Sequence, residues 1–248
     1  MTQHSQQAST PWGLWATLGF SLVIFLAFLV VQTVAIAGYA YYLIQQQPHT
    51  SLAELMPSLA TNGLGISLSL IPGAAAGSLL VILFAWLREN ISVKQYLYMY
   101  WPGFKKIMLW VGLLILFAIG MEVVNQYTER PMPSWMVDSY KTAGVLPLFW
   151  FTLVIAAPIF EELLFRGFLF EGLRYSRIGN LGAIIITSAL WASIHLQYEL
   201  FEVVSIFLIG LLFGYAKIKT GSLYTSIIMH ALMNLAATVQ VALLVNQQ

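Results

Sequence analysis

The chain has 248 residues, of which 59% are hydrophobic and only 8% are charged, and it contains no cysteine. Soluble domains carry about 25% charged residues, so this chain has too few charges to cover a surface that faces water. The lack of cysteine excludes a disulfide framework, a cysteine metal site and a thiol nucleophile. A net charge of +1 without a basic run gives no reason to expect nucleic acid as a partner. Composition therefore predicts an integral membrane protein whose main partner is the lipid bilayer.

Long apolar runs recur along the whole chain. A membrane-spanning helix needs about 20 mostly apolar residues. Runs of this kind lie at about 13–44, 63–87, 107–125, 145–170, 181–197, 200–216 and 222–244. The first run is far longer than the core of a signal peptide, so we expect it to be kept as a membrane anchor. The pattern predicts an all-α fold, a polytopic transmembrane helix bundle with about seven spans.

Lysine and arginine are concentrated in alternate loops between these runs. Only Arg130 and Lys141 lie in the loops of the other set. Positively charged short loops stay in the cytoplasm, so the N-terminus and the basic loops are predicted to be cytoplasmic. The short loops and the lack of a eukaryotic targeting signal favour a bacterial inner membrane. The residues of the basic loops are Arg88, Lys94, Lys105, Lys106, Arg174, Arg177, Lys217 and Lys219.

Three ionisable residues lie inside the fourth run, in the segment PIFEELLFRG. A charged side chain at bilayer depth costs roughly 2.5–3.5 kcal/mol on insertion scales, so such residues usually face the bundle interior and have a function. Glu162 and Arg166 are four residues apart and can form an ion pair on one helix face. Glu161 lies about 100° further round the helix and keeps a charge to spare. The alternative reading of the ion pair is a salt bridge that only locks two helices together.

Two histidines and an asparagine occur in later runs. His195 ends the fifth run, and His230 and Asn234 share one face of the seventh because they are four residues apart. Counted at 1.5 Å per residue from the cytoplasmic helix ends, these residues and Glu161 fall at similar depths. We therefore expect one site that is open to the cytoplasmic side. His195 alone is also compatible with a structural histidine near the membrane interface.

These residue types suit the hydrolysis of an amide bond. Glu161 is the candidate general base that takes a proton from a water, and His195 is the candidate partner that holds this water. His230 and Asn234 can donate hydrogen bonds to the oxyanion that develops on the attacked carbonyl. Arg166 and Glu162 would then support the site. A metal site is equally compatible, because Glu161, His195 and His230 resemble the ligands of a catalytic zinc ion with one open position.

Four short motifs carry a resemblance to a known family. EELLFR resembles the EExxxR motif of the CAAX protease and bacteriocin-processing family (CPBP, or Abi), which includes CAAX prenyl protease 2, and WASIH is similar to its FxxxH element with Trp191 in place of phenylalanine. FLIGLLFGY fits the family's helix rich in phenylalanine and glycine, and TGSLYTSIIMHALMN fits its final HxxxN element. The resemblance covers about 147–237. It implies an intramembrane protease, of the metalloprotease or the glutamate-dependent type, that cleaves membrane-associated peptides.

The resemblance also divides the chain. Residues 1–142 form N-terminal transmembrane helices without a recognised motif, and 143–246 form the expected catalytic core, with Glu161, Glu162, His195, His230 and Asn234 as its working residues. The expected substrate is a peptide or protein, of the CAAX type or of the bacteriocin or leader type. Two other functions remain open: a non-enzymatic membrane scaffold or bacteriocin-immunity protein, and a proton-coupled transporter, since buried carboxylates and histidines also form proton relays.

Overall fold

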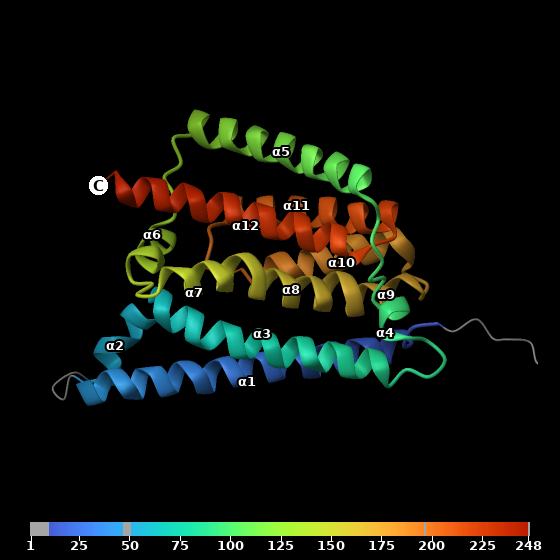
Figure 1. The fold of residues 1–248 in the computed structure, drawn as a ribbon, viewed down its shortest axis with the longest axis horizontal. Coiled ribbons are helices and arrows are strands. Elements are labelled where there is room, and N and C mark those ends of the chain that lie inside the picture. Colours follow the sequence, from blue (N-terminus) through green and yellow to red (C-terminus); the bar gives the residue numbers. More distant parts are fainter. Residues whose placement is uncertain (1–9, 47–50, 196, 248) are drawn as a thin grey trace, which may run out of the picture.

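The computed structural model describes residues 10–46, 51–195 and 197–247. Parts of the predicted N-terminal region 1–142, namely 1–9 and 47–50, therefore lie outside the described residues. Within these ranges the chain is helical and contains no β-strand. Figure 1 shows the long helices running side by side in one bundle, as predicted for an all-α fold. The α-helices are α1 (Leu14–Gln46), α2 (Leu52–Leu59), α3 (Gly63–Trp86), α4 (Val93–Tyr96), α5 (Phe104–Tyr127), α6 (Ser134–Lys141), α7 (Leu146–Phe151), α8 (Ala157–Glu162), α9 (Phe170–Arg174), α10 (Gly179–Ser193), α11 (Leu200–Thr220) and α12 (Leu223–Asn246), and the π-helices are η1 (Thr152–Ala156) and η2 (Leu163–Leu169).

Six segments of the described chain are long and apolar enough to cross a membrane, which identifies an integral membrane protein. They are α1, α3, α5, the continuous run from α7 to α9, α11 and α12. The other predicted span is α10, which has 15 residues and is therefore about 22 Å long. This is shorter than the hydrocarbon core of roughly 30 Å, and the described residues that follow α10, 194–195 and 197–199, are not helical. Non-helical backbone within the hydrocarbon core of a membrane is tolerated where it is buried in protein or lines a cavity.

The fourth span is a continuous helix that contains two π-helical stretches, one on each side of α8. Pro158 has no N–H group, so it cannot donate to the carbonyl of Leu153 five residues earlier, as the π-helical pattern requires. The side chain of Asn234 on α12 supplies the missing donor, with its Nδ2 2.8 Å from the oxygen of Leu153. A proline in the fourth span thus creates a polar contact that ties this span to α12.

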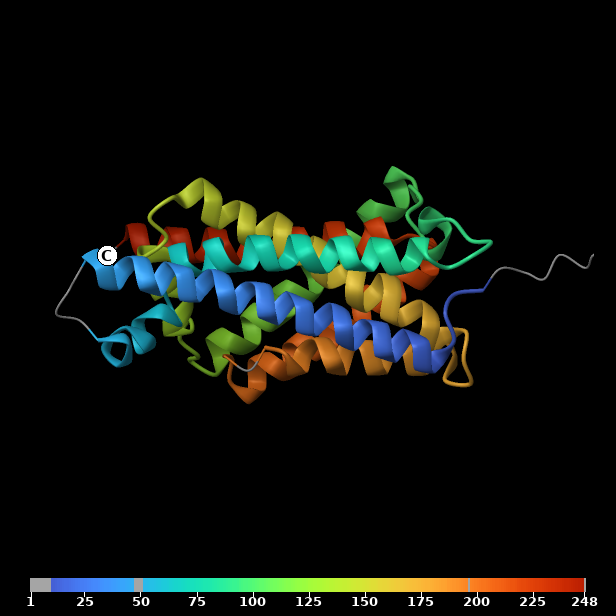
Figure 2. The ribbon, with the colours of Figure 1, turned by 90° about the horizontal axis from the view of Figure 1, so that it is seen from below.

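The two ends of the bundle carry different elements. Figure 1 shows α2, α6 and the C-terminal end of α12 at one end, and α4 and α9 at the other. Figure 2 shows the same separation from a perpendicular direction. We call the end formed by residues 87–106, 171–180 and 217–222 the basic end, because it carries eight of the eleven lysines and arginines. The end formed by α2, α6 and the C-terminal end of α12 is called the opposite end.

A glycine in α3 allows close contact with α8. A Cβ atom added to Gly77 would lie 2.2 Å from Cε2 of the buried Phe160 ring. Because this ring is also stacked on Phe28, with the centroids 4.6 Å apart, it has little room to move. We expect Gly77→Ala to lower the free energy of unfolding by about 1–3 kcal/mol, seen as a lower melting temperature in detergent. Gly112→Ala is the matched control, since no atom lies within 4 Å of its added Cβ; equal melting temperatures for both variants would contradict this packing.

Candidate functional site

Four of the polar residues predicted to form one site, Glu161, Arg166, His195 and His230, contact the buried indole ring of Trp191. Trp191 belongs to α10 and is only 1% exposed. Two separate spans, the fourth span and α12, and the segment after α10 contribute the other side chains, so the arrangement exists only in the folded bundle. They are Glu161 and Glu162 from α8, Arg166 from η2, His195 directly after α10, and His230 and Asn234 from α12.

Glu161 is held by Trp191 and faces His230. The indole N–H of Trp191 donates a hydrogen bond to Oε2 of Glu161 over 2.5 Å. Nε2 of His230 lies 3.9 Å from the same oxygen. The Glu161 side chain keeps 16% of its surface exposed, whereas that of Glu162 is fully buried. Of the two neighbouring carboxylates, Glu161 is therefore the one that a water or a substrate can reach.

Glu162 forms a buried ion pair that also fixes a histidine. Its Oε1 accepts hydrogen bonds from NH1 of Arg166 and from Nδ1 of His230, each over 3.0 Å. The guanidinium group of Arg166 also lies over the ring of Trp191, 4.3 Å from the centroid. Glu162 and Arg166 are both 0% exposed, so each would be strongly destabilising without the other. The spacing of four residues correctly predicted this pair, but gave no sign that it also orients His230.

The two histidines present the same ring nitrogen to the site. Nδ1 of His195 lies 2.7 Å from the carbonyl oxygen of Trp191, and a carbonyl only accepts, so this Nδ1 must carry the proton. Nε2 of neutral His195 then has a free lone pair. In His230 the carboxylate of Glu162 fixes Nδ1 as a donor in the same way. A ring held through one nitrogen leaves the other well oriented to bind a water or a ligand.

The three candidate metal ligands do not fit a zinc ion in this arrangement. Zinc needs ligand atoms about 2.0–2.2 Å away, and therefore needs three side chains that converge on one point. Among the described residues, no three histidine, aspartate or glutamate side chains are grouped in this way. The ring of Trp191 lies close to both imidazole rings, with centroids 5.2 Å from His195 and 5.1 Å from His230, and its N–H occupies an oxygen of Glu161.

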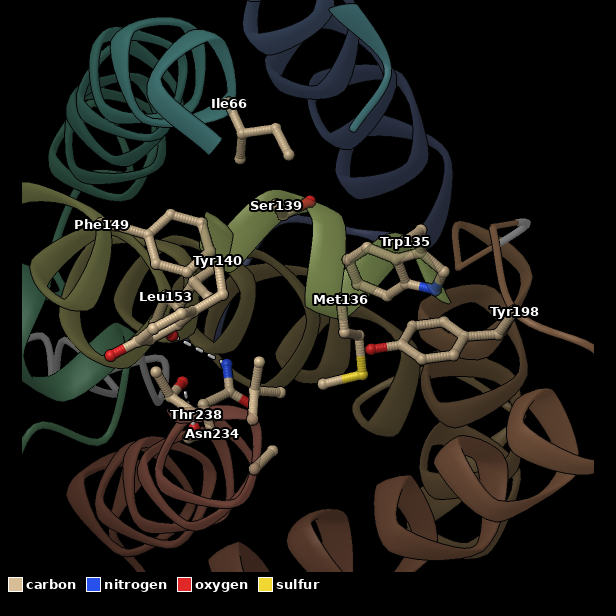
Figure 3. A pocket seen from close by; sticks show the side chains of 12 residues that line it. Ile66, Trp135, Met136, Ser139, Tyr140, Phe149, Leu153, Tyr198, Asn234 and Thr238 are labelled. Atoms are coloured by element: carbon tan, nitrogen blue, oxygen red, sulfur yellow. Dashed lines mark hydrogen bonds between the residues drawn. The ribbon is translucent and has the colours of Figure 1, made fainter. Parts of the chain in front are cut away.

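Asn234 lies one turn beyond His230 on α12 but is directed toward the fourth span. One N–H of its amide is used by the carbonyl of Leu153. The amide has a second N–H, which is free to donate elsewhere. Asn234 also lines a cavity of about 110 Å³ together with Leu153 and Tyr198 (Figure 3). Its predicted role as an oxyanion donor therefore rests on the second N–H, and that role stays a prediction.

Two residues of the site were not singled out from the sequence. Trp191 was seen only as an aromatic replacement for phenylalanine, although a buried indole N–H usually needs a hydrogen-bond partner. Tyr198 lies three residues after His195, with the two rings 6.1 Å apart. Burial raises the pKa of Tyr198, and the negative charges of Glu161 and Glu202 raise it further. The hydroxyl group of Tyr198 thus keeps its proton and can act as a hydrogen-bond donor beside the site.

Trp191→Phe tests the hydrogen bond to Glu161 because it keeps an aromatic ring and removes only the N–H donor. A hydrogen bond to a charged group contributes roughly 1.5–3 kcal/mol. We expect kcat for the peptide hydrolysis that the sequence predicts to fall about tenfold or more with KM little changed, since Glu161 loses its fixed orientation. The melting temperature separates this effect from a loss of the fold. An unchanged kcat in a well-folded variant would mean that the bond does not orient Glu161 for catalysis.

Comparisons with known proteins point to the same part of the chain. Residues 143–236 match the family described as "Rce1-like: Type II CAAX prenyl endopeptidase Rce1-like". The chain is also 30% identical over 125 residues to an Escherichia coli protein described as "Uncharacterized 24.3 kDa protein". That match covers 48% of this chain and 57% of the relative, so the chain spans little more than half of the relative's length. No solved structure matches the chain.

The matched region contains Trp191 and all six residues that the sequence predicted for the site, and it lies within the predicted core, 143–246. The motifs and the match to the family model agree, and both support the CAAX protease family as the one that residues 143–236 resemble.

Proposed function

We propose that the protein is an intramembrane endopeptidase that hydrolyses a peptide bond of a membrane-associated substrate, of the CAAX type or of the bacteriocin or leader type, in a bacterial inner membrane. One observation carries the proposal. A partly exposed carboxylate, Glu161, lies 3.9 Å from His230 inside a bundle of membrane-spanning helices, and Trp191 contacts both Glu161 and His195. These are the groups that the activation of a water requires.

In the proposed first step, a water is bound between Glu161 and His195. The free lone pair on Nε2 of His195 accepts one hydrogen of the water, and the carboxylate of Glu161 accepts the other. Glu161 takes the proton as the water oxygen attacks the peptide carbonyl carbon. The bond from Trp191 occupies Oε2 of Glu161, so we expect Oε1 to be the atom that receives the proton.

In the second step, the negative charge on the former carbonyl oxygen needs hydrogen-bond donors. When the ring of His230 is protonated on both nitrogens, Nδ1 donates to Glu162 and Nε2 can donate to the oxyanion. The second N–H of Asn234 is the other proposed donor. When the intermediate collapses, the C–N bond breaks, and the proton held by Glu161 passes to the leaving amine. Glu162 and Arg166 take no proton in this scheme and hold His230 in place.

A zinc ion remains a prediction from the residue types of Glu161, His195 and His230. The mechanism above uses only side chains of the chain, because the arrangement of these three groups does not fit the ion. Metal analysis of the purified protein tests this prediction directly, with about one equivalent of zinc expected if the three residues rearrange into a ligand set.

The proposal is tested by incubating the detergent-purified protein with a library of membrane-anchored peptides and identifying new termini by mass spectrometry. We expect specific cleavage by the wild type and a strongly reduced rate for His195→Ala. Asn180→Ala is the control, since Asn180 is exposed at the basic end, far along α10 from His195. Cleavage that His195→Ala performs at the wild-type rate, or no cleavage by well-folded wild type in both detergent and liposomes, would overturn the proposal.

A further inference from the structure

The C-terminal half of α5 packs loosely against the rest of the bundle. Figure 1 shows α5 along the edge of the bundle, beside α11 and α12. Its N-terminal half packs on α11, where the rings of Trp110 and Tyr215 meet edge-on with their centroids 5.7 Å apart. Leu114 is the last buried residue of α5, although this helix continues to Tyr127. The second half of α5 therefore has space beside it.

Two cavities occupy this space between α5, α11 and α12. One has a volume of about 580 Å³, and the other has a volume of about 460 Å³ and extends to α6 at the opposite end. Glu122, Asn125 and Gln240 line both of them, so the two cavities adjoin along α5. Each volume is within the range of ligand-binding cavities, roughly 300–1,000 Å³. We call the first the apolar cavity and the second the polar cavity.

The apolar cavity suits a hydrocarbon chain. Among the described residues that line it, all but Glu122, Asn125 and Gln240 are apolar, and Ala236 and Ala237 of α12 contribute only methyl groups. An empty space of this kind deprives its lining of dispersion contacts. Water fills such a space poorly, because each water needs two to four polar partners. The acyl chains of the surrounding bilayer have the chemistry that this lining requires.

The polar cavity carries charges of both signs. The carboxylates of Glu122, Glu129 and Glu202 line it together with the guanidinium group of Arg130, which lies 3.9 Å from Glu202. Gln126 donates a hydrogen bond to Glu122 over 3.0 Å, which fixes the direction of this carboxylate. Within the described part of the chain, Oε2 of Glu202 has no hydrogen-bond partner. The lining is net negative, so it suits a ligand with an ammonium group near the carboxylates and an anionic group near Arg130.

We propose that these adjoining cavities bind one phospholipid whose head group contains a primary ammonium group. The acyl chain lies in the apolar cavity, the ammonium group donates hydrogen bonds to the carboxylates, and the phosphate faces Arg130. A trimethylammonium group has no N–H to donate, and a head group with only negative charge is repelled by three carboxylates. Phosphatidylethanolamine therefore fits this lining better than phosphatidylcholine or phosphatidylglycerol.

The proposed lipid site is separate from the candidate active site. Of the six residues predicted for the active site, only Asn234 lines the polar cavity, and none of them lines the apolar cavity. The lipid is thus expected beside the candidate active site and not within it. The inference does not depend on the proposed peptidase function, and its test needs no turnover.

Native mass spectrometry of the delipidated protein in detergent tests the head-group preference. The protein is titrated with phosphatidylethanolamine, phosphatidylcholine and phosphatidylglycerol that carry the same acyl chains. We expect one phosphatidylethanolamine per chain, with a Kd about tenfold lower than for the other two lipids, because a hydrogen bond to a charged group is lost with each of them. Glu122→Gln should reduce this preference, whereas Glu89→Gln, a change at the exposed basic end, should leave it unchanged.

Ala236→Phe tests the position of the acyl chain, because the larger side chain fills part of the apolar cavity. Displacing two methylene groups of the lipid from apolar contacts should weaken the binding of all three lipids about tenfold. Ala37→Phe is the control, since Ala37 is exposed on α1. Circular dichroism checks the fold of each variant, and Glu122→Gln, which keeps the side-chain size, decides the inference by itself if Ala236→Phe does not fold.

Three results would overturn the inference. They are equal binding of the three lipids, a full preference for phosphatidylethanolamine in Glu122→Gln, and a delipidated protein that is a dimer which Ala236→Phe dissociates, because a second chain would then occupy this face. Lipid binding as expected without peptide cleavage would reject the proposed function alone and leave the lipid site standing.

Discussion

Glu161→Gln is expected to lower kcat for peptide cleavage by roughly 10²–10⁴-fold, the usual contribution of a general base. Glutamine has the same size, and its carbonyl oxygen can still accept the hydrogen bond from Trp191. The variant should therefore fold normally and bind substrate with a similar KM, but it cannot take a proton from the water. The measurement is a comparison of kcat and KM for both proteins on one peptide substrate from the library.

Glu89→Gln serves as the control for this variant, since Glu89 is exposed at the basic end and has no role in the proposed mechanism. Its kinetic constants should equal those of the wild type. A Glu161→Gln protein that keeps more than a tenth of the wild-type kcat would show that another group activates the water.

Arg166→Met is expected to lower the free energy of unfolding by about 3–5 kcal/mol, because it leaves the carboxylate of Glu162 buried without its main partner. Glu162 would also hold His230 less firmly, so activity should fall together with stability. Thermal unfolding in detergent, followed by circular dichroism, measures the effect.

The double variant Glu162→Gln/Arg166→Met separates electrostatics from packing. It removes both charges, so no unpaired ion remains buried, and replacing a whole buried pair is often close to neutral. It should melt at a higher temperature than Arg166→Met alone. If the double variant is the less stable protein, the packing of the two side chains and not their charge explains their burial.

The sequence was sufficient for those features that depend on one helix at a time. Apolar length predicted the spans, and a spacing of four residues predicted both the ion pair of Glu162 with Arg166 and the shared face of His230 and Asn234. The prediction that Glu161 and Glu162 face differently also follows from the rotation per residue in a helix. Each of these depends on residues whose relative positions a regular helix fixes.

Contacts between helices were less accessible from the sequence. The turn of Asn234 toward Leu153 depends on a π-helical stretch before Pro158, and the hydrogen bond from Trp191 to Glu161 depends on how α10 is rotated against α8. The burial of Lys217 could not be predicted without knowing that Glu171 on α9 faces α11 and pairs with this lysine. The position of the cavities depends on all the helices together, so it could not be predicted by counting residues along single spans.

The central claim is that Glu161 activates a water that attacks the peptide bond directly. A single turnover in water enriched in ¹⁸O, followed by mass spectrometry of the product and of the Glu161 peptide, tests it. Our account predicts one ¹⁸O atom in the new carboxyl terminus of the product and none in Glu161. A label in the side chain of Glu161, with the product unlabelled, would show that Glu161 is a covalent nucleophile and would contradict the account.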